Sequence, residues 1–130
     1  MKNNLTLIIV LVVVFFVGYF IRTNVLDEKL TEVNFEKDLI DFGTVELGTP
    51  LQEYVTFTNV GNSSLNIKNV EADCGCTVVE WPKHKIKINK TDSILVSYDS
   101  YIEGYFLRKV TVSSNTSEGN VFIWLTGTVK

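Results

Sequence analysis

Two cysteines separated by one residue, Cys74-Gly75-Cys76, are the side chains whose type and spacing could support chemistry. Neighbouring thiols can act as a redox pair, bind a soft metal such as zinc or copper, or pack as small apolar groups. A disulfide within Cys-x-Cys is tight, and its strain would make it easy to reduce. If the element is a strand, both side chains face the same side and point into the interior. Redox chemistry, metal binding and structural packing are therefore the three alternatives for this element.

The residues around the cysteines bear on each alternative. A reactive thiol needs a nearby cation or a helix N-terminus, whereas the sequence neighbours Glu71 and Asp73 are acidic and would raise a thiol pKa. Two sulfurs are half of a structural zinc site, and the single histidine, His84, could join them only through folding. We predict no metal and no cofactor, and Cys74 and Cys76 are candidate redox or structural residues.

No other group of residues predicts catalysis. His84 lies between two lysines beside Pro82, a context typical of a solvated loop. One histidine leaves little for a nucleophile–base pair, and the carboxylates are scattered singly rather than paired. The chain also lacks a glycine-rich phosphate loop. We therefore predict a protein that is not an enzyme, with no catalytic residue.

The segment from Leu5 to Ile21 carries no charge, and Lys2 and Arg22 flank it. As a helix it would span roughly 25 Å, short for a bilayer core, but flanking basic side chains can reach outward to the interface. A cleaved signal peptide needs small residues after the apolar run, and here Phe20 and Ile21 are bulky. A lipoprotein signal needs a cysteine at that place, which is also absent. We predict an uncleaved signal-anchor over residues 1–22, with signal cleavage as the alternative.

The charge distribution bears on orientation and partners. The chain has 12 basic and 15 acidic residues, so without Lys2 and Arg22 the remainder has a net charge near −5. Such a surface does not favour phosphate, and no basic stripe appears, so we predict no nucleic-acid partner. The flanking charges of the helix nearly balance. Its position at the extreme N-terminus leads us to expect a single-pass membrane protein whose C-terminal domain is periplasmic or otherwise extracytoplasmic.

Beyond a polar stretch at 23–34, short apolar runs alternate with turn residues every 8 to 12 positions, a pattern typical of an Ig-like sandwich. Val55 and Phe57 would face inward, with Tyr54 outward. We predict an all-β, antiparallel sandwich of about seven strands, with a closed barrel as the alternative. The expected strands are 33–42, 51–59, 65–72, 77–81, 92–99, 105–114 and 120–129, the last two forming a hairpin.

Several of these runs carry recognisable motifs. They are DFGTV at 41–45, FTNVG at 57–61, VEADCGCT at 70–77, YDS at 98–100 and VTVSSN at 110–115. Together they resemble the bacterial domain-of-unknown-function family numbered fifteen seventy-three, over about residues 35–130. That family is similar to Hydin-type and major-sperm-protein-like Ig folds, which implies a seven-stranded sandwich without established activity. The connection at 83–90 departs from the pattern, because Asn89-Lys90 stands where such domains often carry Pro-Gly.

The predicted organisation is a helix at 1–22, a stalk or helical extension at 23–34 and an Ig-like domain at 35–130. Its expected function is protein binding or assembly at the cell envelope. The expected partners are the membrane, through the helix, and an envelope protein or glycan. The alternative function is thiol redox or copper handling through Cys74 and Cys76.

Overall fold

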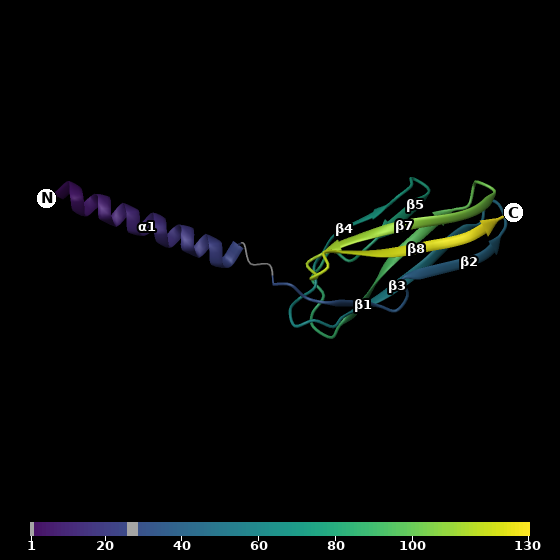
Figure 1. Cartoon of the computed structure of the whole chain (residues 1–130), viewed down its shortest axis with the longest axis horizontal. Helices are drawn as coiled ribbons and strands as arrows, with labels where there is room; N and C mark the ends of the chain where they lie inside the picture. The colour runs from purple at the N-terminus through teal and green to yellow at the C-terminus, as the bar shows by residue number, and fades with distance from the viewer. Residues whose placement is uncertain (1, 26–28) are drawn as a thin grey trace.

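A computed structural model describes residues 2–25 and 29–130 (Figure 1). Helix α1, Lys2–Val25, precedes the β-domain. Its segment Asn4–Arg22 is long and apolar enough to cross a membrane, as a signal sequence also is, and none of it is buried inside the structure. Apolar side chains are exposed all around this helix. A helix of that kind needs an apolar environment rather than one protein face to cover it.

The β-domain consists of two four-stranded sheets packed face to face (Figure 1). The first sheet has the order β1-β3-β6-β5, and the second has the order β2-β8-β7-β4. The bounds are β1 Val33–Phe35, β2 Leu39–Val45, β3 Pro50–Asn59, β4 Ile67–Ala72, β5 Thr77–Glu80, β6 Thr91–Asp99, β7 Gly104–Ser114 and β8 Asn120–Val129. The predicted Ig-like sandwich and its terminal hairpin are thus confirmed.

The core lies between the two sheets, where the inward side chains of alternating strands meet. Val55 and Phe57 of β3 are buried as predicted, while Tyr54, which faces the opposite side of the same strand, is exposed. In β6 the alternate residues Ile94, Val96 and Tyr98 are all buried. Burial on one face only fixes the register, because a slip by one residue would move every apolar side chain into water.

The predicted strand over 33–42 is wrong, because the chain forms two strands there that belong to different sheets. β1 pairs with β3 in the first sheet, whereas β2 crosses over and pairs with β8. The β2–β8 pairing is parallel, so the sandwich is not wholly antiparallel. The described residues therefore contain eight strands rather than about seven. This crossing brings Ile40 into the core between the two sheets, where burial of its side chain favours the second pairing.

The chain joins the domain through Thr31, which lies at what we term the proximal end of the sandwich. Thr31 is buried, and its hydroxyl lies 2.8 Å from Oδ1 of Asn59 and 3.0 Å from the carbonyl oxygen of Ser63. Its amide donates to the carbonyl of Asn115 at 3.0 Å. Of the stretch predicted as a stalk, residues 23–25 are therefore placed in α1 and residues 29–34 against the sandwich. Residues 26–28 lie outside the described chain.

Gly61 shows why the sequence around this end is constrained. The sequence pattern indicates a turn at 60–64, where glycine is expected to supply a positive φ, but Gly61 does not have one. A Cβ on Gly61 would instead collide with Oγ1 of Thr31 and the backbone nitrogen of Glu32. Glycine is needed here for close approach of two chain segments.

Candidate functional site

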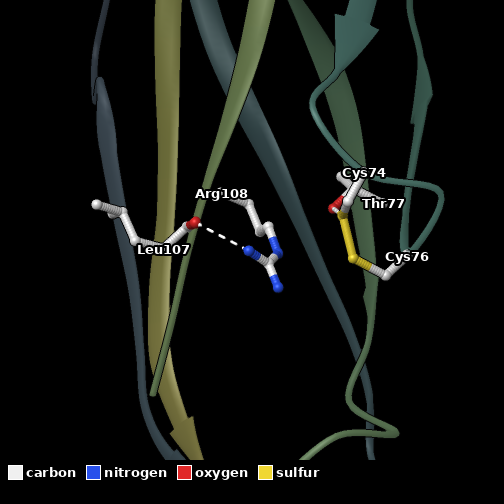
Figure 2. Close-up of a disulfide and its surroundings, with 5 residues drawn as sticks. All are labelled: Cys74, Cys76, Thr77, Leu107 and Arg108. Carbon is white, nitrogen blue, oxygen red and sulfur yellow. Dashed lines mark hydrogen bonds between the residues drawn. A yellow bond between two sulfur atoms is a disulfide. The ribbon is translucent and has the colours of Figure 1, made fainter. Parts of the chain in front are cut away.

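Cys74 and Cys76 form a disulfide in the turn between β4 and β5, the connection that carries the chain from one sheet to the other (Figure 2). Their Cα atoms are 5.3 Å apart. Both residues are partly buried, and Cys76 packs against the core. Two backbone hydrogen bonds fix the turn: Asp73 N donates to Lys109 O at 3.0 Å, and Asp99 N donates to Cys76 O at 2.9 Å.

The position of Cys74 beside β7 follows from the strand register. Ala72 of β4 pairs with Val110 of β7, and the next hydrogen bond joins Asp73 to Lys109. The following inward position on β7 is therefore Arg108, which alternates with the buried residues Phe106 and Val110. Directly opposed residues of neighbouring strands have Cβ atoms about 5 Å apart. The chain thus places the Arg108 side chain on the side of β7 that faces the disulfide, as Figure 2 shows.

Arg108 is incompletely paired. Its Nη1 donates a long hydrogen bond of 3.4 Å to the carbonyl oxygen of Leu107. Its Nε is buried and has no hydrogen-bond partner in the part of the chain that the structure describes. A buried donor without a partner is uncommon and calls for an explanation. On the other side of the bridge, Oγ1 of Thr77 lies 3.4 Å from Sγ of Cys74.

The structure shows how the two cysteines are arranged and which groups lie near them. The expected packing of two free thiols from one strand is wrong, because the residues lie in a turn and are bonded to each other. A metal site of three or more His, Cys, Asp and Glu side chains is not found among the described residues. His84 is exposed and pairs with a carboxylate rather than with the cysteines: its Nε2 is 3.2 Å from Oδ2 of half-buried Asp92. Arg108 was missed from sequence because its neighbour Cys74 is 34 positions away.

A second feature, also missed from sequence, is the outward face of the sheet β2-β8-β7-β4. We term it the outer apolar face, and its residues are Leu39, Tyr105, Leu107, Phe122 and Trp124. Leu39 and Trp124 stand opposite each other in the β2–β8 pairing, and Lys109 stands opposite Trp124 on β7. Nζ of Lys109 lies 5.5 Å from the centre of the Phe122 ring.

This face is unusual for a side of a sheet that no other described part of the chain covers. Phe122 is 45% exposed and Leu107 is 44% exposed, whereas the inward residues Ile123 and Leu125 are fully buried. An antiparallel sheet in water ordinarily presents polar residues outward. Contiguous exposed apolar side chains mark sites of interaction.

Over residues 33–129 the chain matches the family described as "Protein of unknown function (DUF1573)". The chain belongs to this family. The match begins at the first residue of β1 and ends at the last residue of β8, so it coincides with the sandwich. The family description assigns no activity. No curated protein matches the sequence.

Several solved structures share the fold. A protein of unknown function from Porphyromonas gingivalis W83 superposes with a TM-score of 0.66 at 13% identity, over 76% of this chain and 46% of that chain. The ASH/PapD-like domain of human CEP192 gives 0.64 at 10% identity, over 78% of this chain and 87% of that domain. WR4, a C. elegans MSP family member, gives 0.51 at 10% identity, over 77% and 99%. The chain thus spans about half of the Porphyromonas protein, and identities this low show the fold alone.

Proposed function

We propose that this chain is a membrane-anchored binding module, rather than an enzyme, that docks a protein partner on its outer apolar face. The exposure of aromatic and aliphatic side chains across three neighbouring strands carries the proposal. These side chains lie on hydrogen-bonded strands rather than on loops. A rigid face loses little conformational entropy when it binds, which favours affinity.

The chemistry of the face favours a protein over a glycan. Phe, Tyr and Trp are enriched in the buried centres of protein interfaces. Sugar recognition also needs convergent polar groups that fix the orientation of the sugar. The polar groups between the apolar side chains of this face are mainly hydroxyls, and one of them, Thr126 Oγ1, already donates to Tyr105 Oη at 3.0 Å. Lys109, which stands opposite Trp124, lies over the ring of Phe122. The acidic balance of the domain argues against nucleic acid.

Site-specific crosslinking tests the docking surface. We expect a photo-crosslinking residue at position 107 or 122 of the full-length chain to capture one protein in cells. The same residue at position 54 should not, because Tyr54 is even more exposed but lies on the opposite sheet. A Leu107→Ser, Phe122→Ser variant should lose most of the co-purification of that protein from detergent extracts, roughly tenfold or more, since central apolar contacts carry most binding energy.

The matched control is Tyr54→Ser with Val78→Ser, two exposed residues of the other sheet. It should leave co-purification unchanged, and both variants should unfold at the same temperature as the unmodified protein, because exposed substitutions change stability little. Equal crosslinking from all three positions, crosslinks to carbohydrate alone, or crosslinks only to a second copy of this chain would contradict the proposal.

The second part of the proposal is that α1 anchors the domain at a membrane with the domain extracytoplasmic. We expect the full-length chain to stay in the membrane pellet after an alkaline wash and to retain Lys2 in its intact mass. A Val12→Lys, Phe16→Lys variant should be released, because each lysine at the centre of a spanning helix costs about 2.5 to 3.5 kcal/mol. A Val12→Leu, Phe16→Leu variant is the apolar control and should stay in the pellet. A mature chain that begins beyond residue 22 would instead indicate a cleaved signal.

A further inference from the structure

We propose that Cys74 and Cys76 form a reversible thiol–disulfide exchange site, with Arg108 as the charge partner of the Cys74 thiolate, that reacts with a protein carrying two neighbouring thiols. This inference goes beyond the binding function and does not depend on it. It accounts for two observations together: a disulfide between nearly adjacent residues, and an arginine beside it that has a buried, unpartnered nitrogen.

The spacing of the bridge argues against a purely structural role. A disulfide stabilises a fold mainly by restricting the unfolded chain, and the effect grows with the length of the loop that it closes. Cys74 and Cys76 are two positions apart, so the bridge closes a loop of one intervening residue. The turn is also held independently by the hydrogen bonds of Asp73 and Asp99. Breaking the bridge should therefore leave the sandwich folded.

Arg108 supplies the feature that the sequence neighbourhood of the cysteines lacks. A thiolate is stabilised by a nearby cation, and an arginine remains charged under all ordinary conditions. The β4–β7 register ends at Ala72–Val110, the Asp73–Lys109 hydrogen bond continues it by one residue, and Figure 2 shows the Arg108 side chain on the side of the disulfide. In the bridged state its Nε has no acceptor among the residues that the structure describes. A thiolate at Cys74 would provide one, and the Thr77 hydroxyl at 3.4 Å could donate to the same sulfur.

The other ionisable side chains around the turn either are acidic, which disfavours a thiolate, or do not face Cys74. Asp73 and Asp99 are exposed to solvent, which weakens their effect on a neighbouring thiol. Tyr98 is buried and stacks on Phe106 with 4.2 Å between ring centres. Glu71 and Lys109 lie on the outer side of the sheet. Arg108 is thus the one cation on the inward side next to Cys74 in the described chain.

The exchange is balanced with a dithiol as the co-reactant. A thiolate of the dithiol attacks Sγ of Cys76, a mixed disulfide forms, and Cys74 leaves as a thiolate beside Arg108. The second thiol of the dithiol then loses its proton and attacks the dithiol's own sulfur in the mixed disulfide, which releases Cys76. Two electrons pass to the cysteines, which take up the two protons, and the dithiol becomes a disulfide. A thiol of lower pKa is the better leaving group, which is why Cys74 is assigned that role.

The first test uses the full-length chain in detergent and dithiothreitol as the dithiol. Free thiols are blocked at once on lysis, and intact mass then gives the oxidation state. We expect a bridged protein that a few millimolar dithiothreitol reduces without unfolding, at a rate comparable to that of oxidised glutathione. Adding oxidised dithiothreitol should restore the bridge. Two free thiols at isolation, or a bridge reduced only in denaturant, would overturn the proposal.

The second test examines Arg108. Arg108→Gln should slow reduction at neutral pH roughly three- to tenfold, whereas Arg108→Lys should keep most of the rate, because only the former removes the charge. A second comparison leaves Arg108 in place, so its result does not depend on the folding of the Arg108 variants. In Cys76→Ser, alkylation of Cys74 should rise at a lower pH than alkylation of Cys76 does in Cys74→Ser. An equal or reversed order, or no effect of Arg108→Gln in a folded protein, would refute the role of Arg108.

Discussion

Replacing Asn59 by alanine should lower the free energy of unfolding by about 3 to 4 kcal/mol. Asn59 is fully buried at the last position of β3. Its Nδ2 donates to the carbonyl oxygens of Ser63 at 2.8 Å and Ile86 at 3.0 Å. Its Oδ1 accepts from the hydroxyl of Thr31 at 2.8 Å and the amide of Gly61 at 3.2 Å. Alanine would remove these four hydrogen bonds together and leave an unfilled space at a fully buried position, and both losses lower stability.

Denaturant unfolding of the full-length chain, followed by tryptophan fluorescence, measures this loss. Asn62→Ala is the matched control, because Asn62 is an exposed asparagine three positions along the same turn, and it should change stability by less than about 0.5 kcal/mol. Asn59→Asp tests the donors alone, because it keeps the size of the side chain but replaces Nδ2, which carries both N–H donors, by an oxygen. If Asn59→Ala were as stable as Asn62→Ala, the side chain would not hold the proximal end together.

The regular part of the fold could be predicted from sequence because its signals are local. The β7–β8 hairpin follows from two alternating runs around a short turn, and its ten paired positions keep one register throughout. The inward positions of β3 and β6 follow from the same period of two. In each case, residues close in sequence carry the apolar pattern that burial then enforces.

The parts that could not be predicted depend on contacts between distant segments. The crossing from β1 to β2 occurs between Phe35 and Leu39 without proline or glycine to mark it. Asn59 has the sequence context of an ordinary turn residue, and its role depends on Thr31 and Ile86, about 28 positions away on either side. The FTNVG motif at 57–61 places Asn59 two positions before Gly61 but does not show what either residue contacts.

β7 links the two proposed sites through the alternation of its side chains. Leu107 points outward into the outer apolar face, while Arg108 points inward toward the bridge. The two residues are neighbours, and the backbone carbonyl of Leu107 accepts the hydrogen bond from Arg108. A negative charge that forms at Cys74 would therefore act on β7, the strand that carries Leu107 of the proposed docking face.

Replacing Gly61 by alanine should destabilise the protein by about 3 kcal/mol, although it adds a single methyl group. The added Cβ would collide with Oγ1 of Thr31 and the backbone nitrogen of Glu32, and it would lie 2.9 Å from Cα of Thr31. Two of these three atoms belong to the backbone, so a side-chain rotation cannot relieve the clash. The segment would have to move, which would break the hydrogen bonds from the amides of Val60 and Gly61 to the carbonyl of Glu32.

Gly75→Ala is the matched control, because a Cβ there meets no atom within 4 Å and the backbone does not have a positive φ. It should leave stability unchanged or raise it by about 0.5 kcal/mol, since alanine restricts the unfolded chain. Hydrogen exchange locates the effect. In Gly61→Ala the backbone amides of residues 31, 60 and 61 should exchange faster, while those of β7 and β8 should remain the more protected ones. Equal stability of the two alanine variants would mean that Thr31 and Glu32 do not pack against this turn. The chain would then join the sandwich at β1 rather than at Thr31.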